Sequence, residues 1–117
     1  MAQSLAAGKL VELPAITSIA RTLGAPKVSD FTYRLVRNLV EEVFVVDDAA
    51  AARALFLLLE RNKHLTEPAA SCCLAAAETQ RAQFTPKDQV VLVLCGGNVS
   101  TEDLTGFYTR FATSPEA

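Results

Sequence analysis

Helical spacing of apolar residues dominates the chain, and each helical stretch carries start or stop signals. Pro14 suits the first turn of a segment reading AITSIARTL, and Gly24 predicts a left-handed cap at its end. Ser29 or Asp30 predicts the N-cap of a second, amphipathic helix. Ser100, followed three residues later by an aspartate, resembles a capping box. The predicted helices cover about 14–23, 30–40, 49–62, 68–83 and 101–111.

Two short apolar runs interrupt the helices and predict buried strands. Residues 43–46 read VFVV and residues 89–94 read QVVLVL, while residues 9–11 are a weaker third candidate. Asp47, directly after the first run, predicts the N-cap of the next helix. Strands that alternate with helices indicate an α/β fold with parallel strands. Because two or three parallel strands make too small a sheet to stand alone, we predict a partial parallel sheet with flanking helices.

Composition and charge narrow the class of partner and the compartment. Half of the 117 residues are apolar, which indicates a tight core or a surface that meets a partner. The net charge is −2 with acids and bases interspersed, so no basic stripe offers a nucleic-acid site. No apolar run approaches the roughly 18–20 residues of a membrane span, and the start of the chain does not resemble a signal peptide. Three cysteines, of which Cys72 and Cys73 are adjacent, fit a reducing compartment, so we predict a cytoplasmic protein.

The sequence LCGGN at residues 94–98 is the candidate site for chemistry. It follows the clearest predicted strand, and ligands in α/β sheets bind beyond the carboxyl ends of strands. Glycine at such a place lets the backbone approach a ligand closely. From the residues alone, an ordinary strand-to-helix turn, with Cys95 as a small buried side chain, is the simpler interpretation.

Three segments occur in an order that resembles a known family. They read GKLVELPAITSIARTLGAP, HLTEPAASCCLAAA and VVLVLCGGN. Together they resemble the fold-type-II pyridoxal-phosphate-dependent serine/threonine dehydratases, within the tryptophan synthase beta-like superfamily, over about residues 3–104. The cysteine of the last motif is similar to the catabolic L-serine dehydratase branch. The resemblance implies that residues 1–112 are a C-terminal portion of the catalytic large domain and that residues 113–117 are a frayed tail.

The resemblance implies that this chain borders a pyridoxal 5'-phosphate site. The side chain of Cys95 would contact the pyridine nitrogen. A neutral thiol does not keep that nitrogen protonated as a carboxylate would, which suits α,β-elimination. Gly96, Gly97 and Asn98 would form the loop beside the ring, although asparagine also suits an ordinary turn. Thr22 would lie beside the active site.

Further roles come from the resemblance, and each has an ordinary structural alternative. Leu23 and Ala25 match positions whose backbone carbonyls bind a monovalent cation, typically K⁺, and the alternative is a helix end without an ion. Glu67 matches a carboxylate near the cofactor. The alternative is an acid that follows a Thr66 cap and gains about 0.3–1 kcal/mol from the helix dipole. Ser71 and the two adjacent cysteines stand where the family usually has Gly or Ala, and packing is a simpler role for these thiols than redox chemistry.

No catalytic residue is expected within this chain. The family carries its Schiff-base lysine in an N-terminal Ser-x-Lys motif and holds the cofactor phosphate on a glycine-rich loop, and neither motif is matched here. The lysines of this chain are Lys9, Lys27, Lys63 and Lys87. We therefore predict a C-terminal fragment of an L-serine or L-threonine ammonia-lyase. It would be inactive alone and would act on its amino acid only with the missing N-terminal half.

Two other functions stay open from the sequence. A non-catalytic module that binds and regulates full-length dehydratase subunits would also explain the apolar excess. An unrelated small α/β binding domain would instead show a closed core. An open strand edge and an apolar face also predict a homo-oligomer. The dehydratase interpretation depends on one placement, which is the thiol of Cys95 and the two following glycines at the mouth of a buried parallel strand.

Overall fold

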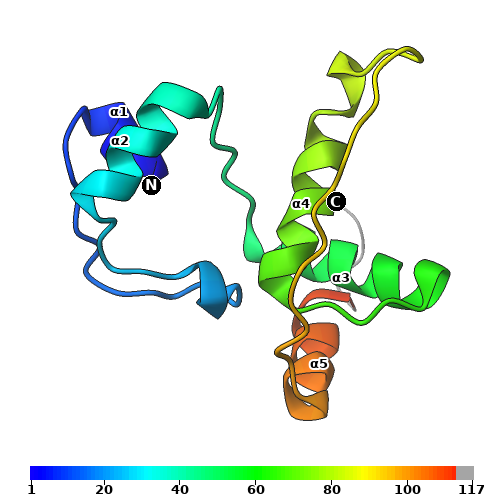
Figure 1. Cartoon of the computed structure of the whole chain (residues 1–117). Helices are drawn as coiled ribbons and strands as arrows, with labels where there is room; N and C mark the ends of the chain where they lie inside the picture. Colours follow the sequence, from blue (N-terminus) through cyan, green and yellow to red (C-terminus); the bar gives the residue numbers. More distant parts are fainter. Residues whose placement is uncertain (113–117) are drawn as a thin grey trace. The chain divides into compact units, whose positions relative to one another are not determined.

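In the computed structural model, the chain forms two compact units (Figure 1). Unit 1 is Met1–Val45, and unit 2 begins at Val46. The structure describes residues 1–112, and the tail predicted at 113–117 lies outside them.

Unit 1 begins with the short helix α1, Ala2–Ala7. Gly8 ends it with φ 65°, a left-handed conformation that glycine adopts without steric cost. Ser4 is buried, and its Oγ accepts the backbone N–H of Val11 at 3.0 Å. The buried hydroxyl therefore ties the chain that leaves α1 back onto the helix.

An isolated antiparallel bridge joins two later segments of unit 1. It pairs Glu12 with Lys27, whose side chains also form an exposed ion pair at 3.7 Å. Next to it, the backbone N–H of Leu13 donates to the carbonyl of Pro26 at 2.7 Å. Exposed ion pairs add little stability, so the backbone bonds matter more. Residues 9–11, the weakest strand candidate, lie before this bridge and do not form a strand.

The helix predicted over 14–23 is wrong except for its last turn. Only the 3-10 turn η1, Arg21–Leu23, is helical. Ser18 Oγ accepts the backbone N–H two residues later at 3.1 Å, an arrangement that competes with helix formation. Gly24 has φ −81°, so the predicted left-handed cap is also wrong. Glycine is needed there for space, because a Cβ would lie 2.5 Å from Cγ2 of Ile16.

Helix α2, Asp30–Leu39, confirms the predicted helix except that it ends one residue earlier, and Ser29 is its N-cap. The Ser29 side chain accepts the N–H of the third residue beyond it at 3.0 Å. Tyr33 is buried on one side of the helix. The apolar side chains of this amphipathic helix fall on one face, and Phe31, Leu35 and Leu39 on it are exposed. This face of α2 therefore has no cover within unit 1.

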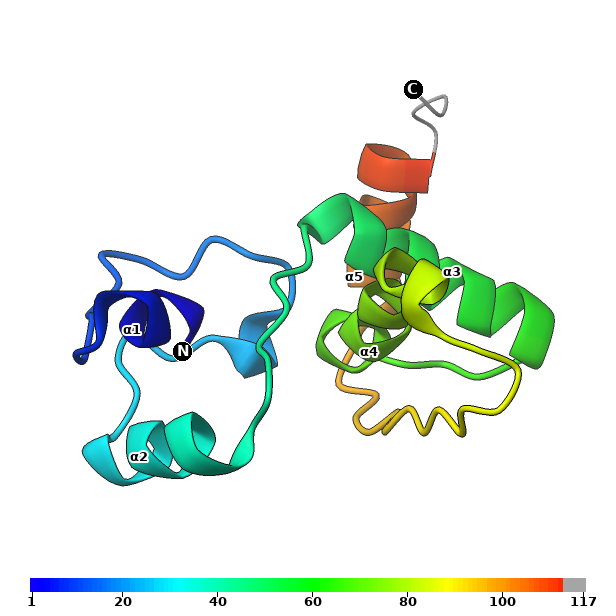
Figure 2. The same ribbon diagram turned by 90° about the horizontal axis from the view of Figure 1, so that it is seen from above.

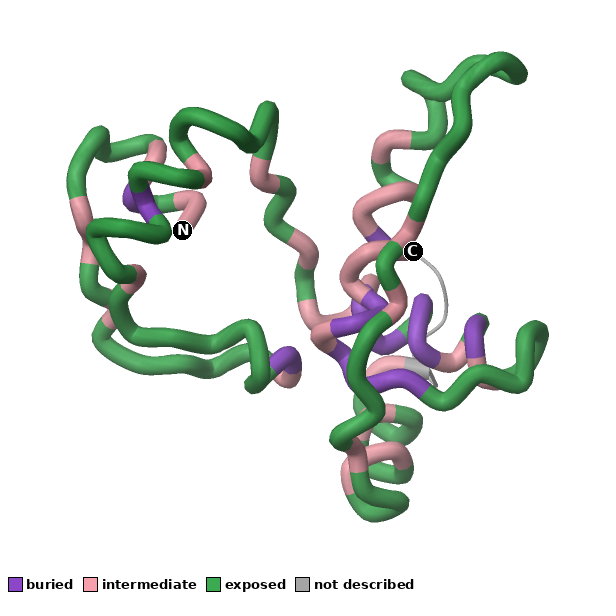
Figure 3. Tube along the Cα trace, viewed as in Figure 1, coloured by how far each residue is buried: buried purple, intermediate pink, exposed green. Residues whose placement is uncertain are grey.

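The core of unit 2 is the packing of α3, Asp48–Asn62, against α4, Pro68–Thr79. Asp47 caps α3 as predicted, because its side chain accepts a backbone N–H at 2.7 Å. Ser71 is fully buried, and its hydroxyl donates to the carbonyl of Ala51 across the helix pair at 2.7 Å. Figure 3 shows the buried residues gathered on these helices and on the segment before α4. Small side chains along the contact allow the two backbones to approach closely.

One helix end in unit 2 differs from the prediction. The helix predicted to reach residue 83 stops earlier, and the 3-10 turn η2, Arg81–Gln83, follows it. The last helix is α5, Thr101–Phe107, which continues as a π-helical turn, η3, Tyr108–Ala112. The capping box predicted at Ser100 is present. The rings of Phe56 and Tyr108 meet edge to face with their centroids 5.3 Å apart, and this contact packs η3 against α3.

Neither predicted strand is paired within the described residues. Residues 89–94 are extended beside α4, where Cys73 Sγ donates to the Val93 carbonyl at 3.3 Å (Figures 1 and 2). Val91 is 83% exposed, and residues 43–46 are likewise extended without a partner. A strand requires a neighbour to receive its backbone hydrogen bonds, and residues 1–112 provide none here. The partial parallel sheet is therefore not found in this part of the chain.

No helix among residues 1–112 combines the length and apolar character needed to cross a bilayer.

Candidate functional site

The start of α4 forms the buried side of the candidate site in unit 2. Pro68 occupies the first turn and Glu67 is the N-cap residue, without a side-chain capping hydrogen bond. The prediction that Thr66 caps this helix is wrong. Thr66 is 2% exposed and Glu67 is 8% exposed, so both side chains are buried. The Thr66 hydroxyl has no hydrogen-bond partner among the described residues.

Gly96 lies directly against Glu67. The backbone N–H of Glu67 donates to the Gly96 carbonyl at 3.2 Å. Gly96 has φ 97°, a conformation that side-chain-bearing residues rarely adopt. A Cβ at this position would overlap Oε1 of Glu67 and lie 3.0 Å from its Cδ. The backbone conformation therefore favours glycine at position 96, and any side chain there would require the Glu67 carboxylate to move.

The rest of the glycine loop is open to solvent. Gly97 is exposed, and the nearest atom that a Cβ there would meet is the Leu65 carbonyl oxygen at 3.6 Å. The backbone N–H of Val99 donates to the Gly97 carbonyl at 2.8 Å, which tightens the turn. Cys95 and Asn98 are also exposed. An exposed thiol beside a backbone without side chains suits a flat ligand, as in cofactor-dependent enzymes.

The adjacent cysteines of α4 show packing rather than reactive features. Cys73 is half-buried and donates to the extended segment beside it. Burial raises the pKa of Cys72, and the neighbouring Cys73 and Asp48 raise this pKa further. A raised pKa leaves less thiolate at neutral pH, and the thiolate is the reactive form. These observations support the structural alternative for the cysteine pair.

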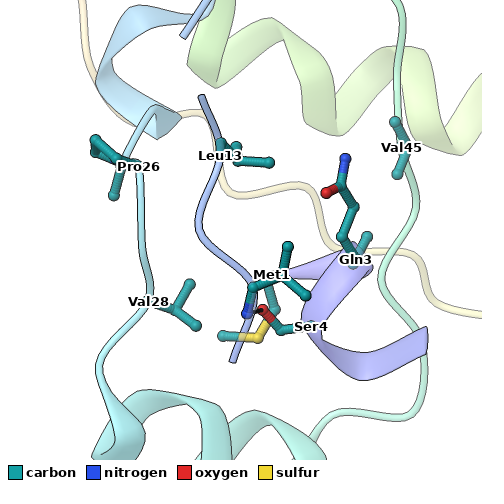
Figure 4. Close-up of a pocket in the computed structure, with 10 residues that line it drawn as sticks. Met1, Gln3, Ser4, Leu13, Pro26, Val28 and Val45 are labelled. Atoms are coloured by element: carbon teal, nitrogen blue, oxygen red, sulfur yellow. Dashed lines mark hydrogen bonds between the residues drawn. The ribbon is translucent and has the colours of Figure 1, made fainter. Parts of the chain in front are cut away.

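The remaining predicted site residues lie in unit 1. Thr22 and Leu23 belong to η1, and Leu23 is 65% exposed. Ala25 lines a cavity of about 200 Å³ between α1 and the segments that follow it (Figure 4). No observation tests cation binding by the carbonyls of Leu23 and Ala25, which stays a prediction. In the described part of the chain, no three His, Cys, Asp or Glu side chains form a group that could hold a metal.

Residues 1–96 match the family model described as pyridoxal-phosphate dependent enzyme. The chain belongs to this family, which confirms the family assigned from its three motifs. It is 36% identical over 120 residues to a serine dehydratase-like protein of Rattus norvegicus. It is also 36% identical over 110 residues to an L-serine dehydratase/L-threonine deaminase of Bos taurus. These matches cover 95% and 86% of this chain but 36% and 34% of the relatives, so the chain spans about a third of their length.

Solved structures give the same class. A fungal L-serine ammonia-lyase from Rhizomucor miehei matches with a TM-score of 0.85 and 29% identity, covering 94% of this chain and 37% of that one. The structure of maize serine racemase matches with a TM-score of 0.78 and 36% identity, covering 93% and 36%. The chain therefore has the backbone course of about a third of such an enzyme. The sheet differs, because the partner strands of residues 89–94 are not among the described residues.

Proposed function

We propose that this chain forms about a third of a pyridoxal-phosphate-dependent L-serine or L-threonine ammonia-lyase. Such an enzyme converts the amino acid to a 2-oxoacid and ammonia by α,β-elimination. The observation that carries the proposal is the glycine loop fixed against the start of α4, in a chain that matches the family over residues 1–96. Relatives described as serine dehydratase and as L-threonine ammonia-lyase support this reaction class. Activity then requires the other two thirds of such an enzyme.

The exposed loop fits one face of the cofactor. Pyridoxal phosphate supplies the electron sink for the elimination when it is bound. Gly96 and Gly97 present bare backbone on which a planar ring can rest. Cys95 is exposed, and its Sγ would face the pyridine nitrogen of the bound cofactor. A thiol is a weak donor and acceptor, so it does not hold a proton on that nitrogen as a carboxylate would.

In the whole enzyme, residues 43–46 and 89–94 would join a parallel sheet. Both segments are already extended, and the second shows the period-two pattern of a strand, with Val91 and Val93 exposed at 83% and 65%. Their backbone N–H and C=O groups need partners once they are buried. Pairing would place Cys95 at the carboxyl end of a strand, where α/β enzymes bind ligands.

Unit 1 would contribute the cation site and part of the active-site wall. The carbonyls of Leu23 and Ala25 would supply oxygen ligands for K⁺, which suit a hard cation. Thr22, a small residue next to them, would border the active site. Replacing K⁺ by Li⁺ in the assay below should lower the rate, and an unchanged rate would argue against the cation site.

Complementation tests the proposal. The chain is co-expressed with the other two thirds of a related serine dehydratase, and the purified pair is given pyridoxal phosphate with L-serine or L-threonine. We expect 2-oxoacid formation by the pair and none by either part alone. A partner without its Schiff-base lysine is the matched control and should be inactive. If both parts are folded and associated but yield no 2-oxoacid, the proposal is wrong.

A non-catalytic role is the second candidate. The exposed apolar face of α2 and the exposed side chain of Val91 favour it, because both could contact another protein. In that role the chain would bind intact dehydratase subunits and change their rate. Cys95→Ala separates the two functions. This change should impair the complemented enzyme but leave the effect of a regulatory chain on intact subunits unaltered.

A further inference from the structure

Glu67 contacts the glycine loop through both its backbone and its side chain. Its N–H donates to the Gly96 carbonyl at 3.2 Å, and its carboxylate fills the space where a side chain at position 96 would lie. The carboxylate is buried, whereas Cys95 and Asn98 in the same loop are exposed. Glu67 therefore lies behind the loop, on the side of α4, and not on its exposed surface.

We propose that Glu67 is a positioning residue, which fixes the direction of the loop and so the place of the Cys95 thiol. This inference rests on the proposed function and changes the role expected for Glu67 from cofactor contact to support of the loop. Because Gly96 turns the chain with φ 97°, a small rotation there would move Cys95 on one side and Gly97 on the other. The carboxylate occupies the space beside the Gly96 Cα, where it would oppose such a rotation.

The segment 65–67 supports both glycines of the loop. The Leu65 carbonyl is the nearest contact for a side chain at Gly97, as the Glu67 carboxylate is for one at Gly96. Pro68 anchors this segment at the first turn of α4, whose packing on α3 forms the core of unit 2. The loop is thus attached to the core through residues that precede the helix. The contact with Gly96 is one of shape, because the carboxylate occupies the space that a side chain at position 96 would fill.

Hydrogen exchange of the chain alone tests the inference without any cofactor. The amides to follow are those of Glu67 and Val99, which donate to the carbonyls of Gly96 and Gly97. Glu67→Gln keeps the shape and should leave exchange unchanged. Glu67→Ala removes the shape and should speed exchange at both amides by about tenfold or more, with helix content unaltered. Equal protection in Glu67→Ala, or equal loss in both variants, would overturn the inference.

A double-mutant cycle isolates the contact between the two residues. Gly96→Ala carries backbone strain in any background, and this part cancels when the cycle is closed. The clash with the side chain of residue 67 is absent when that residue is Ala. Gly96→Ala should lower the folding equilibrium constant in both backgrounds. The factor should be about tenfold larger in the original chain than in Glu67→Ala. The same loss in both backgrounds would show that no steric coupling exists.

The complemented enzyme separates positioning from contact with the cofactor. If Glu67 acts through the loop, Glu67→Gln should keep the cofactor absorbance spectrum and the pH profile, whereas Glu67→Ala should weaken cofactor binding. A changed spectrum in Glu67→Gln would instead indicate direct contact and overturn the inference. Should the original pair fail to bind pyridoxal phosphate, the proposed function fails, and the exchange measurement still decides the role of Glu67 in the loop.

Discussion

Replacing Thr66 with valine should stabilise the isolated chain. Thr66 is 2% exposed, and its hydroxyl lacks a hydrogen-bond partner among the described residues. A buried hydroxyl without a partner costs about 1–3 kcal/mol, and valine has nearly the same shape without this cost. We therefore expect the free energy of unfolding to rise by about 1–2 kcal/mol. For a unit of this size, each kcal/mol of added stability raises Tm by roughly 4–8 °C.

Thermal unfolding followed by circular dichroism measures this change, with Ser71→Ala as the matched control. Ser71 is also fully buried, but its hydroxyl donates to the Ala51 carbonyl at 2.7 Å. Removing a satisfied hydroxyl should lower stability by about 0.5–1.5 kcal/mol, so the two variants should shift Tm in opposite directions. A lower Tm for Thr66→Val would refute the reasoning, because it would show that the hydroxyl is hydrogen-bonded in solution.

Three further outcomes follow from local contacts. Asp47→Ala removes the side-chain cap of α3 and should cost about 0.5–2 kcal/mol, whereas Asp47→Ser should cost less in the same unfolding assay. The backbone N–H of Thr85, followed by its side chain, lowers the pKa of Asp88. The turn that joins Thr85 to Asp88 is therefore stabilised at pH values above the ordinary aspartate pKa, and this stabilisation is lost as the pH falls through the lowered pKa. An NMR titration in which the pKa of Asp88 is not lowered would contradict this. Burial raises the pKa of Cys72, so iodoacetamide should modify exposed Cys95 first, as mass spectrometry of early time points would show.

Helix starts were predictable because their signals are local. Ser29, Asp47 and Ser100 each accept the backbone N–H of the third residue of their helices, and the sequence shows such capping residues directly. Strands were not predictable in the same way, because pairing depends on a segment distant in the sequence. Residues 89–94 have the alternation of a strand but no partner among the described residues. The helix expected after Pro14 failed for another local reason, the competing hydrogen bond of a serine side chain.

The candidate site was predicted in part. The motif identified Gly96 and Glu67, and the structure brings these two residues together. The sequence did not indicate that the carboxylate lies behind the loop, because that depends on how α4 meets the extended segment. It also suggested a capping role for Thr66, whereas the structure buries this hydroxyl without a partner among the described residues. The placement of Cys95 at the end of a parallel strand is not confirmed among the described residues, and family membership rests on the sequence match.

Alanine predominates among the buried residues of unit 2, which are in large part Ala51, Ala52, Ala54, Ala70 and Ala75. Alanine loses no side-chain entropy on burial but removes little apolar area from water. The heat-capacity increment of unfolding scales with the apolar area that becomes exposed. The chain alone should therefore have a shallow dependence of stability on temperature and a low denaturant m-value. The heat-capacity increment and the m-value should both be much larger when the remainder of an enzyme covers the exposed valines and leucines of this chain.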